Sequence, residues 1–217
     1  MKFWKIDAET REVIGSGEAN KWNIPRNALL VQPLPPKEGF AVVATIDFKG
    51  SKYIPDYRGR TIFSTEDTHQ SKHVEYLGEI EKGWTLKERL PYSIWQNDDW
   101  LQQIDLLKDS KLNEINQWRK AQEDDSTTVV NAVDARWDAC PDARSRIDSA
   151  LLAQQMPPYW TDAEDVDHFG MTLDELRLVK VAIGDFLFNV HDRQRTMKKE
   201  VEMLTDFDEC LSYPVGW

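Results

Sequence analysis

The chain has 217 residues, enough for one large domain or for two small domains that each bury a core. Its formal net charge of −11 repels phosphate groups, so we expect no direct binding to nucleic acid or to an anionic membrane surface. It contains no run of about eighteen apolar residues, so no membrane-spanning helix is predicted.

The first hundred residues contain several short β-strand patterns separated by turns. The segment GFAVVATIDF (39–48) is rich in β-branched and aromatic residues and is the strongest of these patterns. Gly15 and Gly17 are interpreted as bracketing a turn, and a proline-interrupted edge is predicted at LPYSIWQNDDW (90–100). Further strands are predicted at NALLVQPLPP (27–36), RTIFST (60–65) and KHVEYLGEI (72–80). Short strands joined by turns predict a small antiparallel β-rich domain over residues 1–100.

After this region the apolar residues follow a helical period. From Leu101 to Trp118 they recur every three or four positions, which predicts an amphipathic helix. The segment TVVNAVDARWDA (128–139) is either a small hairpin or an extended connection. Pro141 fits the first turn of a second helix, and a long loop is predicted over residues 161–171.

A long helix is predicted over residues 172–204. It starts at TLDE (172–175), a capping box in which the threonine and glutamate side chains each accept from the other's backbone amide. Five apolar residues then recur seven apart and predict a packing seam: Leu176, Ile183, Val190, Met197 and Leu204. The seam is either the inside of an intramolecular helical hairpin or a surface for a homo-oligomer or partner. We therefore expect an α+β fold, with an all-helical C-terminal domain over residues 108–217.

The sequence shows little sign of catalytic chemistry. A phosphate-binding glycine loop, a nucleophile elbow and an H-E-x-x-H motif are all absent, so we expect no enzymatic activity and no cofactor. His69 and His73 are four residues apart, and Glu66 or Asp67 could be a third metal ligand. Zinc needs three or four converging ligands, so a metal-dependent enzyme using His69 and His73 remains the least favoured alternative. Cys140 and Cys210 lack metal-ligand spacing and are interpreted as reduced thiols, with one disulfide as the alternative.

Residues 53–100 resemble a segment of the tail fibre and tail fibre assembly proteins of tailed phages. That segment runs D-x-R-G, a strand, a G-x-(I/L)-x-x-G-x-T region, a proline and a tryptophan-rich end. The matching residues here are Asp56, Arg58, Gly59, Gly78, Gly83, Thr85, Pro91, Trp95 and Trp100. The second half is similar to an uncharacterised helical domain that often ends such phage proteins, through INQWRKAQE (115–123), DARWDACPDARSRIDSALLA (134–153), MTLDELRLVKVAI (171–183) and Trp217.

The resemblance implies a non-enzymatic protein that helps a tail fibre fold or trimerise at its tip. It implies a phage tail fibre protein as partner, and action in the host cytoplasm during assembly or on the virion tail. A permanent structural or adaptor protein of the tail is the alternative. Because aromatic residues are enriched where proteins meet, we expect partner contact in the β-rich domain at Trp84, Tyr92, Trp95 and Trp100. Self-association through the long helix is expected as a second kind of contact.

Overall fold

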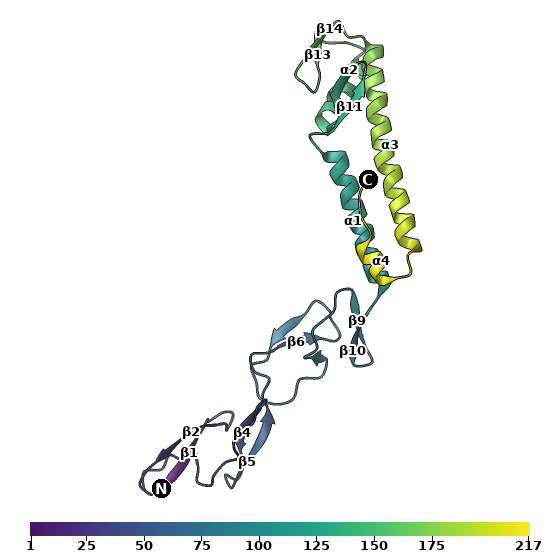
Figure 1. The fold of residues 1–217 in the computed structure, drawn as a ribbon. Coiled ribbons are helices and arrows are strands. Elements are labelled where there is room, and N and C mark those ends of the chain that lie inside the picture. Colours follow the sequence, from purple (N-terminus) through teal and green to yellow (C-terminus); the bar gives the residue numbers. More distant parts are fainter. The chain divides into compact units, whose positions relative to one another are not determined.

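The computed structural model describes residues 1–217, which divide into two compact units, Met1–Gln102 and Gln103–Trp217. The first unit contains only strands and loops, coloured purple to blue in Figure 1. The second, coloured teal to yellow, contains four helices and two β-hairpins. The predicted α+β class is confirmed. The expectation of an all-helical C-terminal domain is wrong, because the two hairpins lie between its helices.

The first unit is built from small antiparallel sheets. Strand β1 (Lys2–Ile6) lies between β2 (Val13–Glu18) and β3 (Ala28–Leu29), and β4 (Phe40–Ala44) pairs with β5 (Ser51–Pro55). Strand β6 (Thr61–Ser64) lies between β7 (Ser71–His73) and β8 (Trp84–Thr85), and β9 (Ser93–Gln96) pairs with β10 (Asp99–Gln102). The strand predicted at residues 39–48 forms β4, whose Val43 and Ala44 are completely buried.

The predicted turn at Gly15 and Gly17 is wrong, because both glycines lie inside strand β2. Gly17 pairs with Phe3 of β1, and the aromatic ring lies across the glycine. A Cβ at position 17 would come within 2.8 Å of that ring. The glycine is therefore needed for the close approach of Phe3, which is itself buried in the core.

Two other segments of the first unit differ from expectation. The strand predicted at residues 72–80 ends at His73, and the amide of Val74 donates to the carbonyl of Arg60, the residue before β6. The segment 90–100 was expected to be an edge, yet it forms most of the β9–β10 hairpin. Asn97 and Asp98 both have positive φ, which makes the two-residue turn that matches the twist of a hairpin. Leu101 therefore belongs to a strand, and the first helix begins three residues later.

The second unit begins with helix α1 (Ile104–Asp124), followed by the hairpin of β11 (Val129–Ala132) and β12 (Ala135–Asp138). Helix α2 (Pro141–Ala153) has proline in its first turn, as predicted. The hairpin of β13 (Tyr159–Thr161) and β14 (Asp167–Phe169) comes next, then α3 (Leu173–Met203) and the short α4 (Phe207–Ser212). The hairpin alternative for residues 128–139 is confirmed.

The loop predicted over residues 161–171 is instead part of the β13–β14 hairpin. Its turn is organised by the buried carboxylate of Asp162, which accepts from the amides of Glu164 and Val166. The other carboxylate oxygen lies 2.8 Å from Nε2 of His168, whose ring packs at a tilt against Trp137. The histidine contact and the Val166 amide hold the pKa of Asp162 below its usual value. One aspartate thus converts a polar run into an ordered turn.

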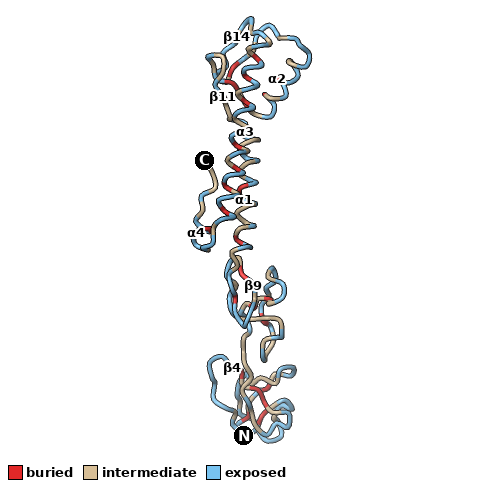
Figure 2. Tube along the Cα trace, turned by 90° about the vertical axis from the view of Figure 1, so that its right-hand side faces the viewer, coloured by how far each residue is buried: buried red, intermediate tan, exposed pale blue.

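Helix α3 starts with the predicted capping box, in which Thr172 and Glu175 exchange both hydrogen bonds. Its N-terminal half covers a core made by the β11–β12 hairpin and α2, around the buried Trp137 and Ile147. Its C-terminal half packs along α1, where Leu107 and Ile115 are completely buried. Figure 2 shows buried segments in red along α1 and α3.

The chain after α3 folds back against α1 and α3. Cys210 of α4 is completely buried, and burial raises the pKa of its thiol. Lys111 donates to the carbonyl of Tyr213, and Arg193 donates to the carbonyl of Gly216 at 2.7 Å. Trp217 ends edge-on against Trp118, with ring centroids 5.4 Å apart. The terminal segment thereby fastens the two long helices to each other.

Candidate partner-binding surface

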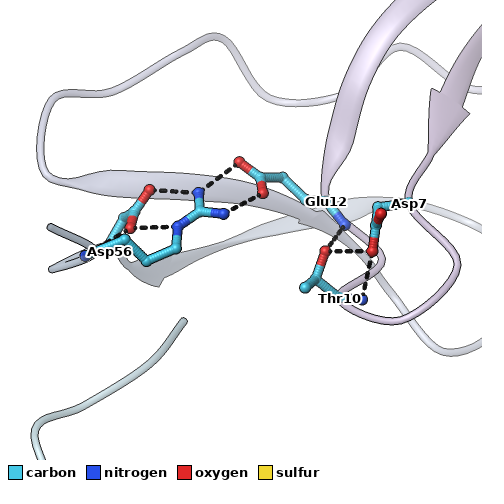
Figure 3. Close-up of polar contacts among 5 residues, drawn as sticks. Asp7, Thr10, Glu12 and Asp56 are labelled. Carbon is cyan, nitrogen blue, oxygen red and sulfur yellow. Dashed lines mark hydrogen bonds and ion pairs between the residues drawn. The ribbon is translucent and has the colours of Figure 1, made fainter. Parts of the chain in front are cut away.

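The D-x-R-G segment, one of the segments that carry the resemblance to phage proteins, forms a structural junction in the first unit (Figure 3). The guanidinium of Arg58 donates to both carboxylate oxygens of Glu12, each at 2.9 Å. It also donates to both oxygens of Asp56, at 2.8 and 2.6 Å. Gly59 has a φ of +80°, which favours glycine, and its amide donates to the carbonyl of Val74. The motif therefore ties the β1–β2 turn, the end of β5 and the end of β7 together.

The electrostatics of this junction are those of a structural ion pair. The Arg58 guanidinium holds the pKa of Asp56 below its usual value, and the two carboxylates raise the pKa of Arg58. All three side chains keep between 23% and 36% of their surface exposed, so water screens the pairing. Because the guanidinium is already shared by two carboxylates, it has little capacity left for a ligand.

The β9–β10 hairpin contains two of the four aromatic residues predicted to bind a partner. Trp95 and Trp100 face each other across the strands, with ring centroids 5.1 Å apart at 71°. Trp100 is only 3% exposed, and its indole Nε1 donates to the carbonyl of Lys87. Trp95 is half-buried, with the Lys87 ammonium 5.8 Å from its ring centroid. The pair is thus the inner face of the hairpin, and Trp100 has a structural role in this chain.

Two exposed apolar residues lie on the outer face of the same hairpin. Ile94 and Leu101 are directly opposite each other and are 39% and 41% exposed. Leu90, just before the hairpin, is 46% exposed. We call Leu90, Ile94 and Leu101 the hairpin patch. Sequence reasoning missed it by preferring aromatic residues, although the alternation in SIWQ and DWLQ places Ile94 and Leu101 on one side once the turn is known.

The other two predicted aromatic residues lie outside the inner pair. Trp84 is half-buried on β8, and the ammonium of Lys72 lies 4.3 Å from its ring centroid. Lys72 also pairs with Glu81 at 2.6 Å, so this face of the indole is occupied by a fixed charge. Tyr92 is half-buried just before β9, in the left-handed region with a φ of +55°.

His69 and His73, the two residues proposed as metal ligands from the sequence, do not belong to a cluster of metal-binding side chains. His69 lies in the turn before β7 and His73 at the end of that strand, and both are exposed. The Nδ1 atom of His73 lies 3.3 Å from the hydroxyl of Thr61, and the amide of His69 donates to Asp67. No group of three or more histidine, cysteine, aspartate or glutamate side chains is placed to hold a metal ion.

The predicted oligomer seam faces the inside of the second unit. Leu176, Val190 and Met197 are completely buried, Ile183 is 4% exposed, and Leu204 is half-buried. The interruption of the seam at Gln194 is also buried: its amide nitrogen donates to Asn116 of α1, and its oxygen accepts from Arg119. The structure thus favours the intramolecular hairpin, and a second copy would need a different face of α3.

Comparison with known proteins bears on both halves of the prediction. A family model described as a domain of unknown function (DUF4376) matches residues 107–209, which lie in the second unit. The prophage tail fiber assembly protein homolog TfaE of Escherichia coli K12 is 32% identical over 105 residues, covering 46% of this chain and 52% of that protein. A tail fiber assembly protein homolog of Escherichia coli is 30% identical over 102 residues, covering 45% and 50%.

The predicted resemblance to tail fibre assembly proteins is confirmed. The chain spans about half the length of the curated relatives that it matches. No solved structure matches it. None of its four helices combines the length and the apolar character needed to cross a membrane.

Proposed function

We propose that this protein assists the assembly of a phage tail fibre by binding the fibre protein directly. The similarity to relatives named for tail fibre assembly is the observation that supports this function. The protein acts by non-covalent surface contact, and its own side chains make or break no covalent bond. The site of action is the host cytoplasm during assembly, or the virion tail if the factor stays attached.

The physical need for such a factor follows from β-rich fibre tips. Intertwined strands pair over long sequence distances, so they fold slowly and leave strand edges and apolar surface exposed on the way. A protein that covers these surfaces until three fibre chains have met would suppress aggregation. An apolar patch beside a strand edge is suited to this task, because it can bind both backbone and side chains of an incomplete sheet.

We assign the contact to the hairpin patch and to the edges of the β9–β10 hairpin. The hairpin is a sheet of only two strands, so each strand has one side without a neighbouring strand. Ile94 and Leu101 lie above that ladder on the exposed side. An added fibre strand would bury them, and it would leave the inner Trp95–Trp100 pair in place.

Co-expression with the tail fibre protein of the same phage tests the proposal. We expect the two proteins to elute together in size-exclusion chromatography, and the yield of soluble fibre trimer to fall when this chain is omitted. Ile94→Asp and Leu101→Asp should each weaken the complex by about tenfold or more, because each puts a charge into the proposed contact. Ile46→Asp is the matched control, since Ile46 is 83% exposed in the same unit and outside the hairpin patch.

Failure to co-elute, with no effect of this chain on the soluble fibre, would refute the assembly role. Equal weakening by Ile46→Asp would refute the assignment to the hairpin patch. Purified virions distinguish a departing factor from the alternative, a permanent tail component: a stoichiometric band of this chain in the particles would favour the structural role.

A further inference from the structure

Helix α3 has a second apolar stripe, on the side opposite its buried seam. Leu178, Val181 and Phe188 are 58%, 58% and 66% exposed. At about 100° per residue the three side chains lie within about 80° of one another, and about 120–160° from Leu176 and Ile183. Exposed leucine, valine and phenylalanine on one helical face form an apolar surface that single scattered residues do not.

A glycine lies at the edge of this stripe, between Val181 and Phe188 along the helix. Gly184 is exposed, and a Cβ at its position would meet no atom of the chain within 4 Å. Packing within the chain therefore does not require glycine here, although glycine inside a helix is less stable than alanine. A missing side chain does allow the backbone of a second helix to come close.

The charged residues that flank the stripe are arranged symmetrically about that glycine. Asp174 and Arg177 lie toward the N-terminal end of the helix, and Asp192 and Arg195 toward the C-terminal end. Positions 177 and 192 have their midpoint at 184.5, and so do positions 174 and 195. Arg177 pairs with Asp174 of its own helix, whereas Asp192 and Arg195 form no ion pair within the chain.

We propose that α3 packs antiparallel against α3 of a second copy, with the two-fold axis between Gly184 and Asp185. This register sets Val181 of each copy against Phe188 of the other. It also sets Arg177 against Asp192 and Asp174 against Arg195, each twice by symmetry. The occupant is a second copy because the stripe is complementary to itself when reversed: the four flanking charges at 174, 177, 192 and 195 each meet an opposite charge at the same height.

The charge pattern also specifies the crossing angle. Asp174 and Arg195 lie about 16 Å from the axis at 1.5 Å per residue. At that distance helices crossing at about 20° are displaced sideways by only about 5 Å, within reach of an arginine side chain, whereas helices crossing at about 50° are displaced sideways by about 13 Å. The dimer therefore uses the shallow crossing. Because each copy contributes only one helix, the interface is small. The fraction of chains in the dimer therefore rises with protein concentration.

Sedimentation of the full-length chain over a concentration series tests the dimer. We expect a species of twice the 25.3 kDa chain mass to grow with concentration. Phe188→Glu should weaken dimerisation by about tenfold or more, because it places a charge in the middle of the contact. Leu152→Glu, at an 88% exposed position of α2, is the matched control and should leave the dimer unchanged. Unchanged helical circular dichroism would show that both variants fold.

A charge-swap mixture tests the register itself. Asp192→Arg alone sets arginine against Arg177, and Arg177→Asp alone sets aspartate against Asp192, so each variant should be largely monomeric. Mixing the two should restore a heterodimer, since both contacts then join opposite charges. In the same register the two Asp185 side chains lie beside each other across the axis, so Asp185→Asn should tighten the dimer.

A wild-type chain that stays monomeric throughout would overturn the proposal, as would an equal effect of Leu152→Glu. A mixture that fails to dimerise would overturn the register. The proposal is independent of fibre binding: the hairpin-patch variants should leave self-association unchanged, and Phe188→Glu should leave fibre binding by a single chain unchanged.

Discussion

Replacing Arg58 by alanine should destabilise the first unit and leave the second unit unchanged. The change removes four side-chain hydrogen bonds to carboxylates, two to Glu12 and two to Asp56. Partly exposed pairs of this kind stabilise a fold by about 0.2–1 kcal/mol each, and bidentate geometry places these two at the upper end. The two carboxylates would also face each other without a cation. We therefore expect a loss of about 2 kcal/mol in the free energy of unfolding.

Hydrogen exchange of the full-length chain, followed by mass spectrometry, measures this effect unit by unit. Peptides covering β2, β5 and β7 should exchange faster in Arg58→Ala, and peptides from α1 and α3 are the internal control. The exchange rates of Arg58→Lys should fall between those of the wild type and of Arg58→Ala, because an ammonium keeps the charge and loses the forked geometry. Unchanged exchange around Gly59 and Val74 would refute the view that this arginine holds the junction together.

The effect should also depend on pH in a defined direction. The pKa of Asp56 is lowered in the folded chain by Arg58, so its contribution is fully present above the unfolded value of about 3.9. It is lost as the pH falls through the folded pKa. The difference in stability between wild type and Arg58→Ala should therefore shrink below about pH 4. A difference that stays constant into acid would contradict the ion-pair explanation.

Two further changes test the second unit, both by urea unfolding followed at 222 nm. Thr172→Ala removes half of the capping box and should cost about 1 kcal/mol, whereas the neighbouring surface change Asp174→Ala should cost less; equal losses would argue against the cap. Gln194→Leu should change stability by less than about 1 kcal/mol, because Asn116 and Arg119 still reach water. Met197→Ala, one turn along the same seam, should cost about 2–5 kcal/mol by opening a cavity, and the reverse order would refute this account of the seam.

The local patterns of the second unit were predictable because they depend on neighbours in sequence. The capping box at Thr172 and the proline at the start of α2 are satisfied within one helical turn. The seven-residue spacing of Leu176, Ile183 and Val190 identified the buried side of α3. Spacing alone left open what would cover that side, because an intramolecular helix and a second copy require the same apolar stripe.

The remaining features depend on contacts that the spacing of residues along the chain does not reveal. Gly17 resembles a turn residue until Phe3 is placed across it, and Asp162 orders a hairpin only when its carboxylate meets three groups from the following residues. The aromatic residues chosen as binding candidates illustrate the same limit. Trp100 is buried and Ile94 is exposed because a two-residue turn pairs their strands in one particular register. Which side of a short strand faces water is set by what packs against it, and a strand of four residues carries too little pattern to reveal that neighbour.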